Sequence, residues 1–129
     1  MAAAGTPCVL VTMSEAALAE EVCSRLPAGT FSFLVTGDMV SRGKPHPEPY
    51  QLAFDRLAAQ IPGLAKGRVL AIEDSFPGVT SARAAGLVTL GVPHFVPLPP
   101  DDSRHEWDTL AGKTAADLAS LVHAEAAAR

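Results

Sequence analysis

The sequence has few cysteines, no long apolar run and no excess of positive charge, and each absence excludes a class of protein. Cys8 and Cys23 are too few for the disulfide framework of a small secreted domain, so we expect two buried thiols in a reducing compartment. No apolar run approaches the roughly 20 residues that span a bilayer. A formal net charge of −4, with singly scattered lysines and arginines, provides no basic surface for nucleic acid. The first residues also lack the positive start of a signal peptide. We therefore expect a cytoplasmic protein with no membrane or nucleic-acid partner.

The 129 residues, 48% of them hydrophobic, are enough for one globular domain with its own core. Apolar runs that predict buried strands alternate with three- and four-residue spacings that predict helices. We expect strands at 8–11, 31–35, 69–72 and 88–92, and helices over about 15–25, 50–59, 76–85 and 114–128. An irregular loop is expected over about 93–112, with a short extended piece at 107–110. This order predicts an α/β fold, a parallel sheet with helices on both faces.

Specific residues set the expected helix boundaries and faces. Ser14 is the expected N-cap of the first helix, whose buried stripe should be Leu18, Val22 and Leu26. Ser75 is the expected cap of the helix after the third strand, and Gly86 should end it. The strand over 69–72 is apolar throughout, which favours burial on both faces. Thr114 and Asp117 resemble a capping box for the last helix.

Polar side chains follow two of the expected strands. Thr12, Met13 and Ser14 follow the first, and Glu73 and Asp74 follow the third. Ligands bind at the carboxyl ends of parallel strands, and paired carboxylates there suit a hard cation such as Mg²⁺. Lys44 lies in a loop over 41–49 that is rich in glycine and proline.

These residues resemble three of the four motifs of the haloacid dehalogenase superfamily, in particular its β-phosphoglucomutase-like branch. The matching strings are Leu-Val-Thr-Met-Ser around Thr12, Gly-Lys-Pro-His-Pro-Glu-Pro around Lys44, and Ile-Glu-Asp-Ser-Phe-Pro-Gly-Val around Asp74. The resemblance covers roughly residues 9–92 and implies a three-layer, Rossmann-like sheet. The last two strings are specific, whereas a hydroxyl after an apolar run is a weak signal.

The resemblance implies a role for each matched residue. Thr12 and Lys44 would be catalytic and, with Met13 and Ser14, would bind the phosphate of a small phosphorylated substrate. Asp74 would bind Mg²⁺ directly, and Glu73 would be a second ligand or the partner of one.

The sequence departs from the family in containing no Asp-x-Asp motif, the source of the family's nucleophile. The family places that motif and usually a cap domain ahead of the Thr12 strand. We therefore expect a partial core, spanning 1–129, that lacks its central nucleophile strand. A missing N-terminal segment or a second chain would complete the sheet.

Each motif also has a plainer structural reading. Lys44 is otherwise a solvated loop lysine, Glu73 and Asp74 otherwise cap a helix, and Thr12 is otherwise a strand-end hydroxyl. Asp38 is a possible substitute nucleophile, but a loop-ordering aspartate is the better interpretation. Asp101, Asp102, His46 and Trp107 are expected to be surface, loop-ordering or packing residues, and the four histidines lack the spacing of a zinc site.

Two functional hypotheses follow. The first is a Mg²⁺-dependent hydrolase, a phosphatase or phosphomutase, whose nucleophile comes from outside this chain. The second is a phosphate- and metal-binding module that performs no turnover.

Overall fold

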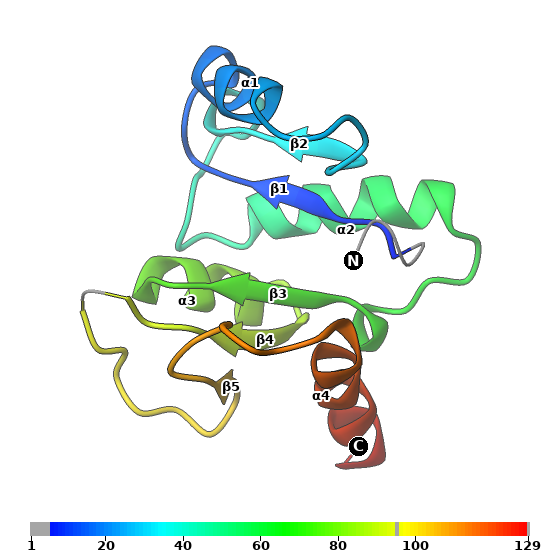
Figure 1. Cartoon of the computed structure of the whole chain (residues 1–129), viewed down its shortest axis with the longest axis vertical. Coiled ribbons are helices and arrows are strands. Elements are labelled where there is room, and N and C mark those ends of the chain that lie inside the picture. The colour runs from blue at the N-terminus through cyan, green and yellow to red at the C-terminus, as the bar shows by residue number, and fades with distance from the viewer. Residues whose placement is uncertain (1–5, 95, 129) are drawn as a thin grey trace.

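The computed structural model describes residues 6–94 and 96–128 and has parallel strands connected by helices, which confirms the predicted α/β class (Figure 1). Its elements in chain order are β1 (Val9–Val11), α1 (Ala16–Ser24), β2 (Phe33–Val35), η2 (Gly37–Met39), α2 (Glu48–Gln60), η3 (Lys66–Arg68), β3 (Leu70–Glu73), α3 (Phe76–Ala84), β4 (Val88–Gly91), β5 (His105–Glu106) and α4 (Ala115–Ala128). No helix in the described ranges is long and apolar enough to cross a membrane.

The strands form two separate parallel sheets. In the first, β1 pairs with β2, with Val9 opposite Phe33. In the second, the order is β3-β4-β5, with Leu70 opposite Val88 and Leu90 opposite His105. Within the described residues, β1 and β3 face each other without a ladder of hydrogen bonds between them (Figure 1). The sheet is therefore interrupted at the position where the resemblance predicts a missing central strand.

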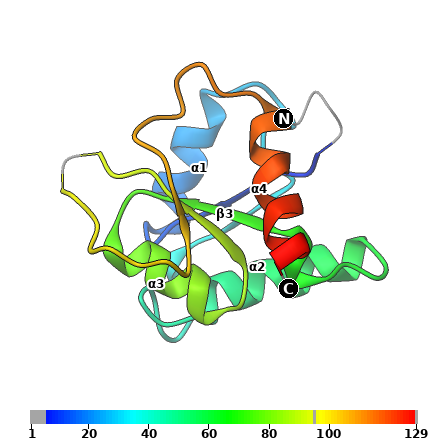
Figure 2. The same ribbon diagram turned by 90° about the horizontal axis from the view of Figure 1, so that it is seen from below.

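Helices lie on both faces of the interrupted sheet. Figure 2 shows α1 and α4 on one side of the strands and α2 and α3 on the other. The main apolar cluster lies beneath α2 and α3 and contains Tyr50, Ala71, Ala82, Ala85 and Leu87. This cluster joins α2, which also packs on β1 and β2, to α3, which packs on β3 and β4. Helix packing thus holds the two sheets together on that face.

Several boundaries agree with the local sequence signals. Ser75 caps α3 by accepting a hydrogen bond from the Gly78 N–H at 3.2 Å. Gly86 follows that helix with φ of 85°, a left-handed conformation that glycine adopts readily. Thr114 and Asp117 exchange side chain to backbone hydrogen bonds of 2.8 and 3.2 Å, as a capping box requires.

The predicted buried stripe of the first helix is wrong. Leu18, Val22 and Leu26 are 58%, 52% and 41% exposed, and α1 packs instead through Ala19. The two-stranded sheet beside α1 is narrow, so the described chain offers little surface to cover the larger side chains. Ser14 is also not the N-cap. Its N–H donates to the Thr12 hydroxyl at 3.2 Å, and Glu15 occupies the cap position without a side-chain hydrogen bond.

Two strand predictions also need correction. The third strand is not buried on both faces, because Ile72 is 37% exposed beside the space between β1 and β3. The last extended piece is His105–Glu106, two residues before the predicted 107–110. It forms there because its backbone pairs with the buried strand β4, and the Trp107 N–H continues this pairing to the Gly91 carbonyl at 3.0 Å.

Candidate functional site

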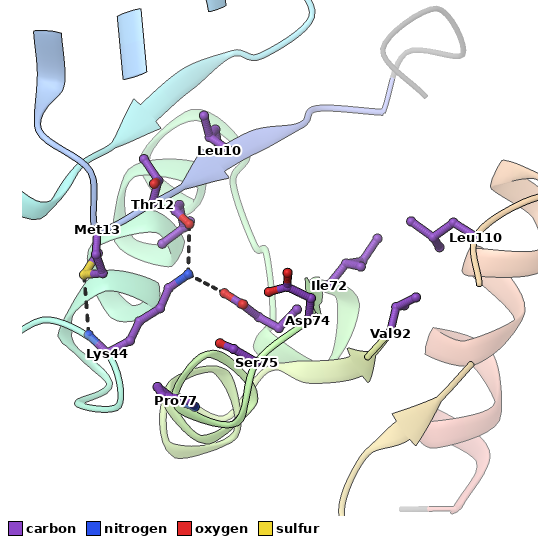
Figure 3. A pocket seen from close by; sticks show the side chains of 12 residues that line it. Leu10, Thr12, Met13, Lys44, Ile72, Asp74, Ser75, Pro77, Val92 and Leu110 are labelled. Carbon is purple, nitrogen blue, oxygen red and sulfur yellow. Dashed lines mark hydrogen bonds and ion pairs between the residues drawn. The ribbon is translucent and has the colours of Figure 1, made fainter. Parts of the chain in front are cut away.

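A cavity of about 620 Å³ occupies the interruption between β1 and β3. Both strands contribute their carboxyl-terminal residues to it, and the loop before α2 contributes Lys44 (Figure 3). Its lining residues are Leu10, Val11, Thr12, Met13, Lys44, Ile72, Glu73, Asp74, Ser75, Pro77, Val92 and Leu110. Thr12, Met13, Lys44, Glu73 and Asp74, which the sequence placed in one site, are therefore brought together. Ser14 is not among the lining residues.

Lys44 connects the two sheets across this cavity. Its ammonium donates to the Val11 carbonyl at 3.0 Å, at the end of β1, and forms an ion pair with the Glu73 carboxylate, at the end of β3. Its backbone N–H donates to the Met13 sulfur at 3.4 Å (Figure 3). The side chains of Lys44 and Glu73 are only 13% and 8% exposed, so the pair is shielded from water. Lys44 is therefore not a solvated loop lysine.

Glu73 is held on three sides. Its Oε1 accepts hydrogen bonds from the Lys44 ammonium and from the Tyr50 hydroxyl, the latter at 2.5 Å. Its Oε2 lies against Gly78, where an added Cβ would be 2.0 Å away. Burial raises the pKa of the Tyr50 hydroxyl, and the negative charge of Glu73 raises it further. Tyr50 therefore remains a protonated donor to Glu73 near neutral pH.

Asp74 differs from Glu73 because its side chain is exposed and lines the cavity. Mg²⁺ retains several water ligands and is usually held by one or two carboxylates together with substrate phosphate. Asp74 fits that requirement at the cavity edge, whereas Glu73 is already bonded to Lys44 and Tyr50. The described residues contain no group of three or more metal-ligating side chains. Among the described carboxylates that line the cavity, Asp74 is therefore the one that could hold a cation.

Thr12 and Met13 both line the cavity but make different contacts. Thr12 lines the cavity, and its hydroxyl accepts a hydrogen bond from the Ser14 N–H, as a strand-end hydroxyl does. Met13 supports the loop that carries Lys44 through its sulfur. The Ser14 carbonyl accepts the Gly37 N–H at 3.0 Å, so both of its backbone groups are used in ordering the turn.

The residues expected to order loops do so. Asp38 accepts the Thr36 hydroxyl and, at 3.4 Å, the Ala16 N–H at the start of α1. The Thr36 hydrogen bond lowers the pKa of Asp38. The His46 imidazole accepts the Glu48 N–H at 3.2 Å, and its carbonyl accepts the Ser81 hydroxyl at 2.6 Å. Asp38 therefore has a structural role, as predicted.

Other side chains also have local structural contacts. Asp101 accepts the Ser103 N–H in a surface loop, and the Lys113 ammonium lies 4.9 Å from the centre of the Trp107 ring. The two cysteines are free, but they are half-buried instead of fully buried.

Sequence reasoning missed the roles of Tyr50 and Gly78. The sequence placed Tyr50 at the start of an expected helix and Gly78 within the string around Asp74, and it assigned neither residue a role at the site. One signal was available for Tyr50, because a buried tyrosine hydroxyl usually requires a polar partner. No sequence signal identified Glu73 as that partner, since the two residues are 23 positions apart.

Comparison with known proteins gives a family match over residues 1–86, to the haloacid dehalogenase-like hydrolases. The chain is 34% identical over 89 residues to phosphoglycolate phosphatase of Neisseria gonorrhoeae, a match that covers 68% of this chain and 36% of the relative. It is 37% identical over 91 residues to hexitol phosphatase A of Escherichia coli, covering 69% and 39%. The chain thus spans little more than a third of each of these relatives.

Solved structures agree with this match. CbbY from Rhodobacter sphaeroides in complex with phosphate superposes with a TM-score of 0.76 at 28% identity, covering 91% of this chain and 53% of that one. A beta-phosphoglucomutase-type protein from Thermotoga maritima superposes with a TM-score of 0.63 at 32% identity, covering 79% and 45%. The superpositions include most of this chain, whereas about half of each neighbour lies outside them.

Proposed function

The chain belongs to the haloacid dehalogenase-like hydrolase family, and we propose that it forms the phosphate- and Mg²⁺-holding part of a phosphatase or phosphomutase for a small phosphorylated metabolite. The observation that carries this proposal is the position of Lys44. Its ammonium lies at the carboxyl ends of β1 and β3, in the same cavity as Thr12 and Asp74.

The proposed roles follow from these contacts. Lys44 and the Thr12 hydroxyl would hold the phosphate oxygens, because a lysine ammonium and a hydroxyl donor stabilise the negative charge of a phosphoryl group. Asp74 would hold Mg²⁺, which supplies further charge neutralisation to the phosphate when bound. Met13 would position the Lys44 loop. Ser14 does not line the cavity, and its backbone groups are already paired, so we place the phosphate contacts on Lys44 and Thr12.

We propose that the nucleophile enters on a strand between β1 and β3. The facing edges of these strands have no ladder partner among the described residues, and the cavity separates them. An unpaired buried backbone group costs about 1–3 kcal/mol, so a strand that pairs with both edges would stabilise the fold. A strand of this family that ends in Asp-x-Asp would place its first aspartate beside Lys44 and Asp74.

The test is complementation of the chain by a peptide that carries the Asp-x-Asp strand of a relative. The chain alone should not hydrolyse p-nitrophenyl phosphate, because it lacks the covalent nucleophile. Adding the peptide should raise the melting temperature and produce Mg²⁺-dependent turnover that Lys44→Ala abolishes. The matched control is the same peptide with its first aspartate replaced by asparagine, which should raise the melting temperature without restoring turnover.

The absence of Asp-x-Asp from this sequence favours a second candidate, a binding module without catalysis. Binding of phosphate and Mg²⁺ with no turnover in the complemented complex would support that candidate. Turnover by the chain alone would contradict both proposals.

A further inference from the structure

Tyr50 contacts both members of the Lys44–Glu73 pair. Its hydroxyl donates to Glu73 Oε1, which is also the atom that the Lys44 ammonium contacts. The Lys44 ammonium lies 5.3 Å from the centre of the Tyr50 ring, within the range of a cation–π interaction. Tyr50 is 6% exposed and is the only tyrosine in the chain. The ring and the hydroxyl therefore act on the same ion pair from the α2 side.

The other side of Glu73 is closed by α3. Oε2 lies where even a methyl group at position 78 would not fit, so the carboxylate is confined between Gly78, Tyr50 and Lys44. Asp74, the next residue, is exposed at the cavity. Two adjacent carboxylates are thereby separated in role, since one faces the lysine and the other faces the open cavity.

We propose that Tyr50 is a positioning residue, which keeps the Glu73 carboxylate on Lys44 and away from the cation position beside Asp74. The inference rests on the proposed function, because it assigns Glu73 to the phosphate side of the site and Asp74 to the Mg²⁺ side. Glu73 then fixes the ammonium where phosphate binds, and of these two adjacent carboxylates only Asp74 faces the cation.

Removing the Tyr50 hydroxyl should change the affinities for phosphate and for Mg²⁺ in opposite directions. In Tyr50→Phe, Oε1 loses one donor while it remains in a buried position, which is unfavourable for a charged group. The carboxylate should turn toward the cavity and water, where it adds a second charge beside Asp74. Lys44 loses its fixed partner, so the position of its ammonium is no longer constrained. Phosphate affinity should therefore fall and Mg²⁺ affinity should rise.

The experiment measures the binding of inorganic phosphate and of Mg²⁺, each alone, by NMR titration of the full 129-residue chain and its variants. Because a hydrogen bond to a charged group contributes about 1.5 kcal/mol or more, Tyr50→Phe should weaken phosphate binding by about tenfold or more. It should tighten Mg²⁺ binding about threefold or more, because a second carboxylate joins the site. Glu73→Gln should also weaken phosphate binding. It should not tighten Mg²⁺ binding, because it removes the carboxylate charge that turns toward the cavity in Tyr50→Phe.

Leu57→Ala is the matched control, because it removes a buried side chain from α2 without touching the ion pair. It should lower stability and leave both affinities unchanged. If Tyr50→Phe leaves both affinities unchanged, or lowers both, the positioning role is wrong. If Tyr50→Phe does not fold, Glu73→Gln provides the test instead. Unchanged phosphate binding by Glu73→Gln would then overturn the positioning role of Tyr50. A wild-type chain that binds neither probe overturns the proposed function itself.

Discussion

Gly78→Ala tests whether the confinement of Glu73 controls both stability and ligand binding. In an ordinary helix this substitution is stabilising by about 0.5–1 kcal/mol, because alanine loses less backbone entropy than glycine on folding. Here the new Cβ would lie 2.0 Å from Glu73 Oε2, 2.3 Å from Cδ and 2.9 Å from Cγ. Contacts this short require the Glu73 side chain to move from Cγ outward, and the movement separates it from Lys44 and Tyr50.

The stability lost with the Glu73 contacts should exceed the stability gained from the higher helix propensity of alanine. Removing one partner of a buried ion pair costs about 3–5 kcal/mol of stability. Displacing Glu73 should cost less, about 2–3 kcal/mol, because its carboxylate can reach water. A buried Tyr50 hydroxyl left without its acceptor adds about 1 kcal/mol or more. After subtracting the helix-propensity gain, we expect Gly78→Ala to be destabilised by about 2–3 kcal/mol, a large share of a typical net stability of 5–15 kcal/mol.

The assay is urea unfolding followed by circular dichroism, with phosphate binding measured in parallel. Thr80→Ala is the matched control, because it changes helix propensity within α3 without an added contact to Glu73. It should be neutral or slightly stabilising, and it should leave phosphate binding intact. The reasoning is refuted if Gly78→Ala is as stable as Thr80→Ala and binds phosphate as the wild type does.

Three further outcomes are expected. We expect the chain to bind Mg²⁺ weakly, in the millimolar range, and Asp74→Asn should abolish this binding in an NMR titration; equal binding by both proteins would contradict the assignment. The chain alone should melt at low temperature with a broad transition, since two strand edges face the cavity; a sharp transition from a monomer by calorimetry would argue against this. Hydrogen bonding by Thr36 lowers the pKa of Asp38 below its unfolded value near 3.9, so its stabilising contribution is complete above that value and is lost as pH falls through the lower folded pKa. Asp38→Asn should therefore lose less stability than the wild type between about pH 4 and 2, as measured by urea unfolding.

Local sequence signals predicted the parts of the fold that depend on neighbouring residues. Ser75, Gly86 and the Thr114–Asp117 box fix helix ends through contacts within a few positions. The glycine- and proline-rich string around Lys44 and the carboxylates after β3 likewise predicted residues that line the cavity, because parallel strands bring their carboxyl ends to one edge.

Features that depend on what covers a surface could not be predicted in the same way. Periodicity identified the apolar stripe of α1, but it did not say whether the chain supplies a surface against Leu18 and Val22. The link from Tyr50 to Glu73 depends on how α2 packs beside β3, which the pattern of either segment alone does not contain.

The position of Lys44 leads to a final prediction, that the strand peptide and phosphate bind cooperatively. Lys44 connects β1 to β3 because its ammonium donates to the Val11 carbonyl while it pairs with Glu73. Phosphate that replaces the Val11 carbonyl on the ammonium therefore weakens the link between the two sheets of the lone chain, although Glu73 stays paired with Lys44. A strand paired with both edges would replace that link and release the ammonium for the anion. Coupling between two sites is reciprocal and is typically 5- to 150-fold, so the peptide should tighten phosphate binding by a factor in that range.

The same factor must appear in peptide affinity when phosphate is present, because the coupling free energy belongs to the pair of ligands. Calorimetric titration of each ligand, with and without the other, measures both sides of the cycle. Lys44→Met removes the charge that serves both the link and the anion, and should abolish the coupling while the peptide still binds. Equal phosphate affinity in the presence and absence of the peptide would show that Lys44 does not couple sheet closure to anion binding, even if both ligands bind.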